Sequence, residues 1–94
     1  MSSEIDDISI NYEEDGQLIV KELDKEVLTR GAWTTILFRY QDFSRAKGEY
    51  GPVKFTIRRY QKRDGKYLPK SKFNISSVKQ AQKIIEVLSK WIEA

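Results

Sequence analysis

The predicted fold rests on residues 53–76, VKFTIRRYQKRDGKYLPKSKFNIS, and on residues 77–92, SVKQAQKIIEVLSKWI, which follow directly. In the first part, Val53, Phe55 and Ile57 alternate with polar residues. Alternation of this kind is typical of a β-strand that buries one face. We therefore expect a strand with an apolar side formed by these three residues and a basic side formed by their neighbours.

This strand and the next form a predicted β-hairpin with Asp64-Gly65 at its turn. The pair favours a hairpin because both central residues of a type I′ turn need a positive φ. Phe73 and Ile75 continue the alternation in the second strand. Pro69 lies inside that strand and cannot donate a ladder hydrogen bond, so we expect an edge position or a bulge there.

A helix is predicted from about Ser77 to the end of the sequence. The Ser77 hydroxyl can cap its first turn, and Gln80 three residues later completes a capping-box pattern. We expect this helix to cover the apolar face of the hairpin. Its apolar stripe extends beyond what so small a sheet can cover, which predicts a homodimer interface because large exposed apolar patches are uncommon on monomers. The expected interface residues are Ile84, Ile85, Leu88, Trp91 and Ile92.

Two more strands are predicted upstream, in Gln17 to Thr29 and in Trp33 to Phe43, the second being rich in β-branched and aromatic residues. A turn or bulge is expected at Asp24-Lys25, a break at Arg30-Gly31, and an exposed loop over Ser44 to Pro52. The predicted fold class is therefore α+β: a curved, four-stranded antiparallel β-meander followed by one C-terminal helix, dimerising through that helix.

The first sixteen residues are acidic and rich in serine, and we predict a mobile N-terminal tail (1–16) ahead of a single domain (17–94). An alternative is a short extra hairpin, because Ile8, Ile10 and Tyr12 alternate ahead of a second Asp-Gly pair. An acidic tail beside a basic face can also compete with nucleic acid by charge mimicry, although we favour a role in solubility, since exposed charges are screened by salt.

Charge is segregated along the chain. The net charge is +3, but residues 1–26 carry nine acids and two bases, a net of −7, while the remainder carries fifteen bases and five acids, a net of +10. Segregation of this kind indicates an anionic partner for the basic part.

Several classes of function are not expected. The 94 residues contain no cysteine and no histidine, so thiol nucleophiles, zinc-thiolate sites and Ser-His-Asp arrangements are excluded. We predict no enzymatic activity, no metal and no nucleotide cofactor, since no glycine-rich phosphate loop is present. Neither a membrane-spanning run nor a signal peptide is predicted, and we expect an intracellular protein of the bacterial cytoplasm or nucleoid, or of the nucleus.

Residues 39–72 hold eleven bases and three acids, with aromatic residues interleaved. Bases on a pleated face can follow phosphates, and rings between them can stack on unpaired bases, which favours single-stranded nucleic acid. Lys54 and Arg58 are expected on one strand face, and Lys70 and Lys72 on one face of the neighbouring strand. An alternative is that lysine on these strands only protects a sheet edge from aggregation.

Residues 53–88 resemble the C-terminal domain of transcriptional positive cofactor four and its small bacterial relatives. The family strand of the type V-x-I/F-x-I-R-x-Y is matched by VKFTIRRY, residues 53–60, and a basic strand and a helix follow in the family order. Upstream, Asp42-Phe43 is similar to the Asp-Phe that ends the second family strand. The resemblance covers about residues 27–92. Gln61 stands where the eukaryotic member has a tryptophan, and Gln41 where it has an arginine.

The resemblance implies a homodimer whose helices pair and whose curved sheets hold single-stranded DNA, with the Asp-Phe aromatic stacking on bases and strand cations holding phosphates. This puts forward Phe43, Arg58, Lys70 and Lys72, while Trp33 or Tyr60 supplies stacking in place of the missing tryptophan. With the basic stretch included, the expected nucleic-acid-binding residues are Trp33, Arg39, Phe43, Arg45, Lys47, Lys54, Arg58, Tyr60, Lys62, Lys70 and Lys72.

The predicted function is therefore that of a largely sequence-independent single-stranded DNA-binding homodimer of this coactivator type, acting in transcription regulation or genome maintenance with the transcription machinery as a further partner. No membrane or small-molecule substrate is expected. The alternatives are a protein-interaction module or an RNA-binding protein that uses the same basic face.

Overall fold

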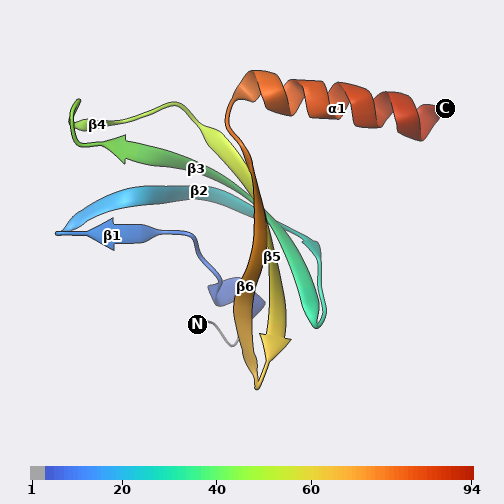
Figure 1. Ribbon diagram of the computed structural model, residues 1–94, viewed down its shortest axis with the longest axis horizontal. Coiled ribbons are helices and arrows are strands. Elements are labelled where there is room, and N and C mark those ends of the chain that lie inside the picture. Colours follow the sequence, from blue (N-terminus) through green and yellow to red (C-terminus); the bar gives the residue numbers. More distant parts are fainter. Residues whose placement is uncertain (1–3) are drawn as a thin grey trace.

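The computed structural model describes residues 4–94. A single 3₁₀ turn, η1 (Ile5–Asp7), precedes the sheet. Six strands and one helix follow (Figure 1): β1 (Tyr12–Glu14), β2 (Gln17–Thr29), β3 (Trp33–Ser44), β4 (Glu49–Tyr50), β5 (Lys54–Arg63), β6 (Lys66–Ile75) and α1 (Val78–Glu93).

All strand pairs are antiparallel, in the order β1-β2-β3-β5-β6, with β4 paired to the end of β3. The predicted α+β class and the meander of four long strands are confirmed. The strand count is wrong: the sheet has six strands, because the N-terminal segment and the loop after β3 each add a short one. The sheet is curled (Figure 1), and register shifts after Glu22, Val27 and Arg59 contribute to the curl, since bulges bend a strand and increase its twist.

Both Asp-Gly pairs form the turns that their chemistry favours. Asp64 and Gly65 have φ values of 51° and 77°, and Asp15 and Gly16 have 51° and 78°. Positive φ at two successive residues is the signature of a type I′ hairpin turn. The predicted hairpin of β5 and β6 is confirmed, as is the alternative of a short hairpin near the N-terminus. Pro69 lies on an edge strand and beside a register shift, as expected.

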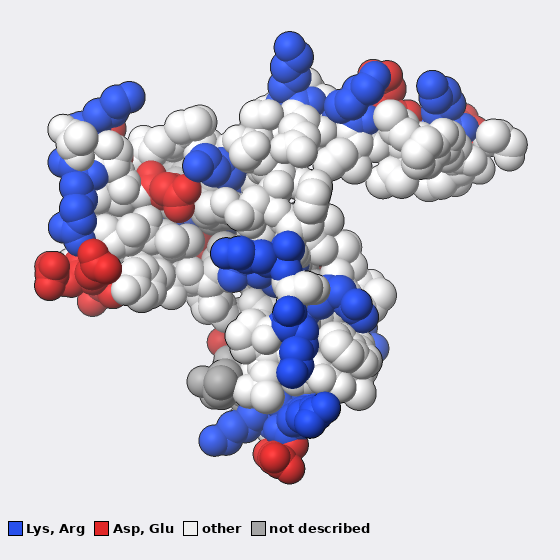
Figure 2. All heavy atoms as spheres, viewed as in Figure 1, with Lys and Arg blue, Asp and Glu red and all other residues white. Residues whose placement is uncertain are grey.

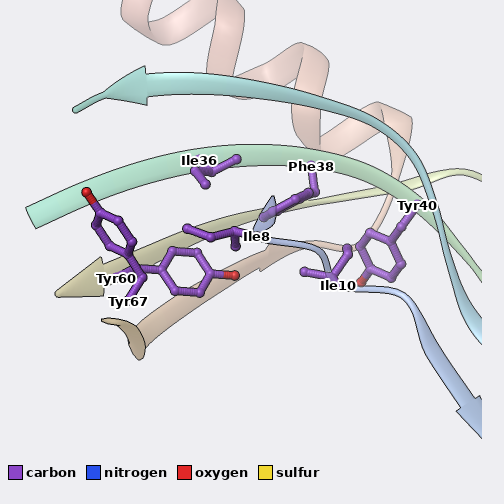
Figure 3. Close-up of a cluster of buried hydrophobic side chains, with 7 residues drawn as sticks. All are labelled: Ile8, Ile10, Ile36, Phe38, Tyr40, Tyr60 and Tyr67. Carbon is purple, nitrogen blue, oxygen red and sulfur yellow. The ribbon is translucent and has the colours of Figure 1, made fainter. Parts of the chain in front are cut away.

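The sheet has two faces, and successive residues along each strand point alternately to one face and to the other. The inner face carries Thr34, Ile36, Phe38 and Tyr40 of β3, and Lys54, Thr56, Arg58 and Tyr60 of β5, which lie opposite them. The outer face carries Trp33, Thr35, Leu37 and Arg39 of β3, and Phe55, Ile57, Arg59 and Gln61 of β5. The hydrophobic core lies on the inner face and consists of Ile8, Ile10, Ile36, Phe38, Tyr40, Tyr60 and Tyr67 (Figure 3).

The prediction for the buried side of β5 is therefore wrong. Thr56 is fully buried, whereas Phe55 and Ile57 remain partly exposed on the outer face. The alternation was identified correctly, but periodicity alone does not say which of the two faces another segment covers. Here the cover comes from the N-terminal strap, which we define as residues 5–11.

The strap places Ile8 and Ile10 in the core, with 4% and 8% of their surfaces exposed. The Lys25 ammonium donates hydrogen bonds to three strap carbonyls, those of Ile5, Asp6 and Ile8, at 3.0, 3.0 and 2.6 Å. Residues 5–11 of the predicted mobile tail (1–16) thus pack against the sheet through Ile5, Ile8 and Ile10. The first three residues of the predicted tail lie outside the described residues.

Helix α1 begins where it was predicted. The Ser77 hydroxyl accepts a hydrogen bond from the Gln80 amide at 3.1 Å. The Gln80 side chain reaches the amide of Ser76 at 3.0 Å, one residue before the expected partner. Contrary to expectation, α1 does not cover the sheet. It extends away from the end of β6 (Figure 1), and none of its residues is buried.

Among residues 4–94, no helix combines the length and the apolarity that crossing a membrane requires.

Replacing Phe38 by alanine should destabilise the protein by about 3–5 kcal/mol, because a fully buried aromatic ring would leave a cavity in the core. The shift of the urea unfolding midpoint measures this change. Tyr12→Ala is the matched control, since the Tyr12 ring is 53% exposed on β1. An equal loss of stability in both variants would contradict the assignment of the core to the inner face.

Candidate nucleic-acid interface

The structure gathers three of the predicted cations on neighbouring strands. Arg58 of β5 lies directly opposite Lys72 of β6, on the inner face. Between them and the register shift at Pro69 is a shallow hollow of about 190 Å³, lined by Arg58, Pro69, Lys70, Ser71 and Lys72. We call this the basic hollow. In Figure 2, lysine and arginine side chains gather on the viewed side along the paired strands β5 and β6.

The Arg58 guanidinium is held in place by a short hydrogen-bonded chain. Its Nε donates to the Thr56 hydroxyl at 3.2 Å, and that hydroxyl donates to the Asn74 side-chain oxygen at 2.8 Å. Thr56 is fully buried, so its position is fixed by the core. Buried hydroxyl groups need hydrogen-bond partners, and this one has them on both sides. The core of the sheet therefore orients the Arg58 side chain that lines the basic hollow.

The cations of the basic hollow have no acidic partner. For Arg58, Lys70 and Lys72 the structure records no ion pair within residues 4–94. Several positive charges held close together without counter-charges repel one another and attract an anion. A phosphate group is the biological anion that such a cluster of Arg and Lys commonly binds.

Other predicted cations are already engaged within the chain. Lys54 donates to the Asp42 carboxylate at 3.0 Å, and this hydrogen bond raises the pKa of Lys54 above its ordinary value. Arg45 lies 3.1 Å from a Glu14 oxygen. Arg39 faces Asp24 across the strand pair, 3.6 Å away. These pairs are exposed and each contributes little to stability, but they lower the positive charge available to a ligand.

Lys62 lies further along the inner face of β5. Its ammonium is 5.5 Å from the centre of the Tyr67 ring, a cation–π arrangement, and Lys62 has no ion pair in the described part of the chain. Lys47 is exposed in the turn between β3 and β4, close to Arg45 in the sequence, and does not line the basic hollow.

The predicted stacking aromatics do not lie beside the basic hollow. Trp33 is on the outer face, 43% exposed, with the Arg59 guanidinium 4.5 Å from its ring centre. Phe43 also points to the outer side and packs edge-on against Tyr50, with ring centres 5.1 Å apart. Trp33 and Phe43 therefore lie on the face opposite Arg58, because alternation along β3 sends its odd-numbered residues away from Arg58.

Tyr60 is on the inner face but is covered. Only 6% of its surface is exposed, beneath the N-terminal strap. Burial raises the pKa of its phenol, and the nearby Arg58 guanidinium opposes that rise. In the conformation observed, Tyr60 cannot stack on a base as expected.

Sequence reasoning missed the Arg59–Trp33 pair and the role of Lys25. Nothing local in the sequence marks either contact, since each joins residues on different segments. The burial of Ile8 and Ile10 did have a signal, namely their alternation with polar neighbours.

A hollow of about 720 Å³ lies open between η1 and β2, and is lined by Asp6, Glu22, Leu23, Asp24, Lys25, Glu26, Val27 and Arg30. Within the described residues, no three acidic side chains are grouped as ligands for a metal ion.

Comparison with known proteins identifies no match: no protein-family model, no curated protein and no solved structure is similar enough to this chain to place it in a family. The resemblance to transcriptional positive cofactor four thus stays a prediction.

The phenol of Tyr60 predicts a loss of stability in alkali. Its pKa is raised above the ordinary 10.0 in the folded chain, so the unfolded chain loses this proton first. The stabilisation is complete below the unfolded pKa and disappears as the pH rises through the folded one. Tyr60→Phe should therefore lose less stability than the native chain as the pH rises above about 10, the ordinary pKa of tyrosine.

Urea unfolding at each pH measures this difference. Tyr12→Phe removes an exposed phenol and should follow the native profile. If Tyr60→Phe showed the same pH profile of stability as the native chain, the burial of Tyr60 would not affect the ionisation of its phenol.

Proposed function

We propose that this chain binds single-stranded DNA as a homodimer, largely without regard to sequence. The observation that carries the proposal is the basic hollow, where three cations with no acidic partner among residues 4–94 line one depression on a β-sheet. Spaced cations of this kind can hold successive phosphates of one strand. Contacts to phosphates carry no sequence information, so the binding would tolerate any sequence.

A single strand suits this surface better than a duplex. Major-groove recognition commonly uses a helix with polar residues facing the bases, whereas the helix here carries an apolar stripe. A flexible single strand can follow the curl of the sheet and turn its bases toward aromatic rings. A role in transcription regulation or genome maintenance, with the transcription machinery as partner, is proposed on the resemblance alone.

The homodimer is supported by two apolar surfaces that residues 4–94 leave at least partly exposed. On α1, Leu88, Trp91 and Ile92 are 49%, 67% and 80% exposed. On the outer face of the sheet, Leu37 and Ile57 are partly exposed and Phe73 is 53% exposed. Exposed apolar surface of this extent is unusual for a monomer. In a dimer with twofold symmetry each chain would cover the same surfaces of the other.

Arg58→Ala should weaken binding of a labelled strand of about 20 thymidines by roughly 1 kcal/mol or more, which is at least about fivefold in Kd, because it removes a charge-assisted phosphate contact. Fluorescence anisotropy at two salt concentrations measures both the affinity and its salt dependence. Arg39→Ala removes the same group from the outer face and is the matched control; its Kd should change less.

Equal effects of the two substitutions would show that only overall charge matters. Duplex DNA and a single-stranded RNA of the same length serve as competitors. Tighter binding of the RNA would favour the RNA-binding alternative, and the absence of any preference for a single strand would favour an acidic protein partner for the basic face.

Leu88→Asp should convert the dimer to a monomer, because a carboxylate would have to lose its water at the centre of an apolar interface. Sedimentation equilibrium reports the mass directly. Gln82→Asp adds the same charge outside the apolar stripe and should leave the dimer intact. A native chain that sediments as a monomer at high micromolar concentration would rule out this part of the proposal.

A further inference from the structure

We propose that the N-terminal strap is an autoinhibitory segment: it covers a base-stacking floor formed by Tyr40, Tyr60 and Tyr67, and a bound single strand displaces it. This inference rests on the proposed function and adds to it the site where the bases lie and the element that regulates access. Figure 3 shows Ile8 and Ile10 of the strap among the rings of this floor.

Each ring of the floor has a lysine or arginine side chain near it. Tyr40 lies opposite Lys54 in the β3–β5 pairing. Tyr60 is two residues from Arg58 on the same strand face, and Arg58 lines the basic hollow. The ammonium of Lys62 is 5.5 Å from the centre of the Tyr67 ring. Rings alternating with cations on one surface are what single-strand grooves use to stack bases and hold phosphates.

The strap covers the rings without belonging to the sheet. Its residues form no strand, since β1 begins only at Tyr12. Besides the Lys25 contacts, it is held by the Glu22 carboxylate, which accepts from the Ser9 hydroxyl at 2.9 Å and from the Ile10 amide at 3.1 Å. The Asn11 side-chain oxygen also accepts from the Glu22 amide at 2.8 Å, and Ile5 packs against the core. Displacing the strap would break these contacts and expose Ile8 and Ile10, while the ladders of the four long strands stay intact.

The charges of the strap match those of a competing polyanion. Asp6 and Asp7 are exposed on it, and Glu4 precedes it. The inner face of β5 carries Arg58 and Lys62, which have no ion pair within residues 4–94, and Lys54, which is paired with Asp42. A single strand offers the same negative charge together with nucleobases that can stack on the rings. The strap and the single strand therefore compete for the same surface. Because they compete, the measured affinity is the affinity of the open form reduced by the fraction of chains that are open.

The first experiment places a spin label on the strap of the otherwise native chain. The sequence has no cysteine, so Asp7→Cys gives a single labelling site at an exposed position. Saturating a labelled chain with a 20-thymidine strand should change the label from a restricted to a freely moving spectrum. Gln82→Cys on the helix is the control label and should not gain such freedom.

The second experiment measures affinity after weakening the strap. A chain with Ile8→Ser and Ile10→Ser should bind the strand at least about fivefold tighter, because a larger fraction is open before binding. Tyr12→Ser, which removes an exposed ring outside the strap, is the matched control and should not change the Kd. In the strap-weakened chain, Tyr67→Ala should weaken binding of the strand, because it removes a ring on which a nucleobase stacks.

The outcomes separate the two proposals. A bound strand with an unmoved Asp7 label would overturn the autoinhibitory role and leave single-strand binding standing. If neither the native nor the strap-weakened chain preferred a single strand, the proposed function would fall and this inference with it. Should the double substitution unfold the chain, the spin label on the native sequence decides the question alone.

Discussion

A one-layer sheet is stable in water only if apolar groups cover at least one of its faces, and here the register of β3 against β5 determines which face that is. Thr34 pairs with Tyr60 and Tyr40 with Lys54, so Ile36, Phe38 and the buried Thr56 share one side. A slip of one residue would exchange every inner side chain for an outer one. The N-terminal strap covers this side with two isoleucines, and the curl of the sheet encloses them.

The same register gives the inner face two roles that conflict. It supplies the core, which must exclude water, and it carries Arg58 opposite Lys72, which must stay hydrated or bind an anion. The conflict is resolved across the sheet: Ile36 and Phe38 of β3 lie under the strap, while Arg58 and Lys72 lie on β5 and β6, toward the edge of the sheet. This core contains tyrosines, whose hydroxyl groups need hydrogen-bond partners, where aliphatic residues would need none. A tyrosine ring can serve both as part of a core and as a stacking surface.

Helix α1, unlike the inner face of the sheet, has no covered apolar surface among residues 4–94. Its N-cap is complete, but none of its residues is buried, and an isolated helix of sixteen residues is only marginally stable in water. Most helical stability in proteins comes from packing an apolar stripe against another surface. The exposed stripe of α1 and the partly exposed apolar residues on the outer face of the sheet both lack a full apolar cover within residues 4–94.

Local features of the fold follow from the sequence by itself. Both Asp-Gly turns, the irregularity at Pro69, the cap at Ser77 and the order of the four long strands depend on neighbouring residues, whose chemistry is visible in the sequence. Tertiary structure alone decided that Phe55 and Ile57 are outside and that Phe43 and Trp33 are separated from Arg58. Alternation in the sequence marked Ile8 and Ile10, but only the fold placed them in the core. Alternation says that a strand has two different faces, but the choice of the covered face depends on contacts between segments far apart in the chain, and no local pattern encodes those contacts.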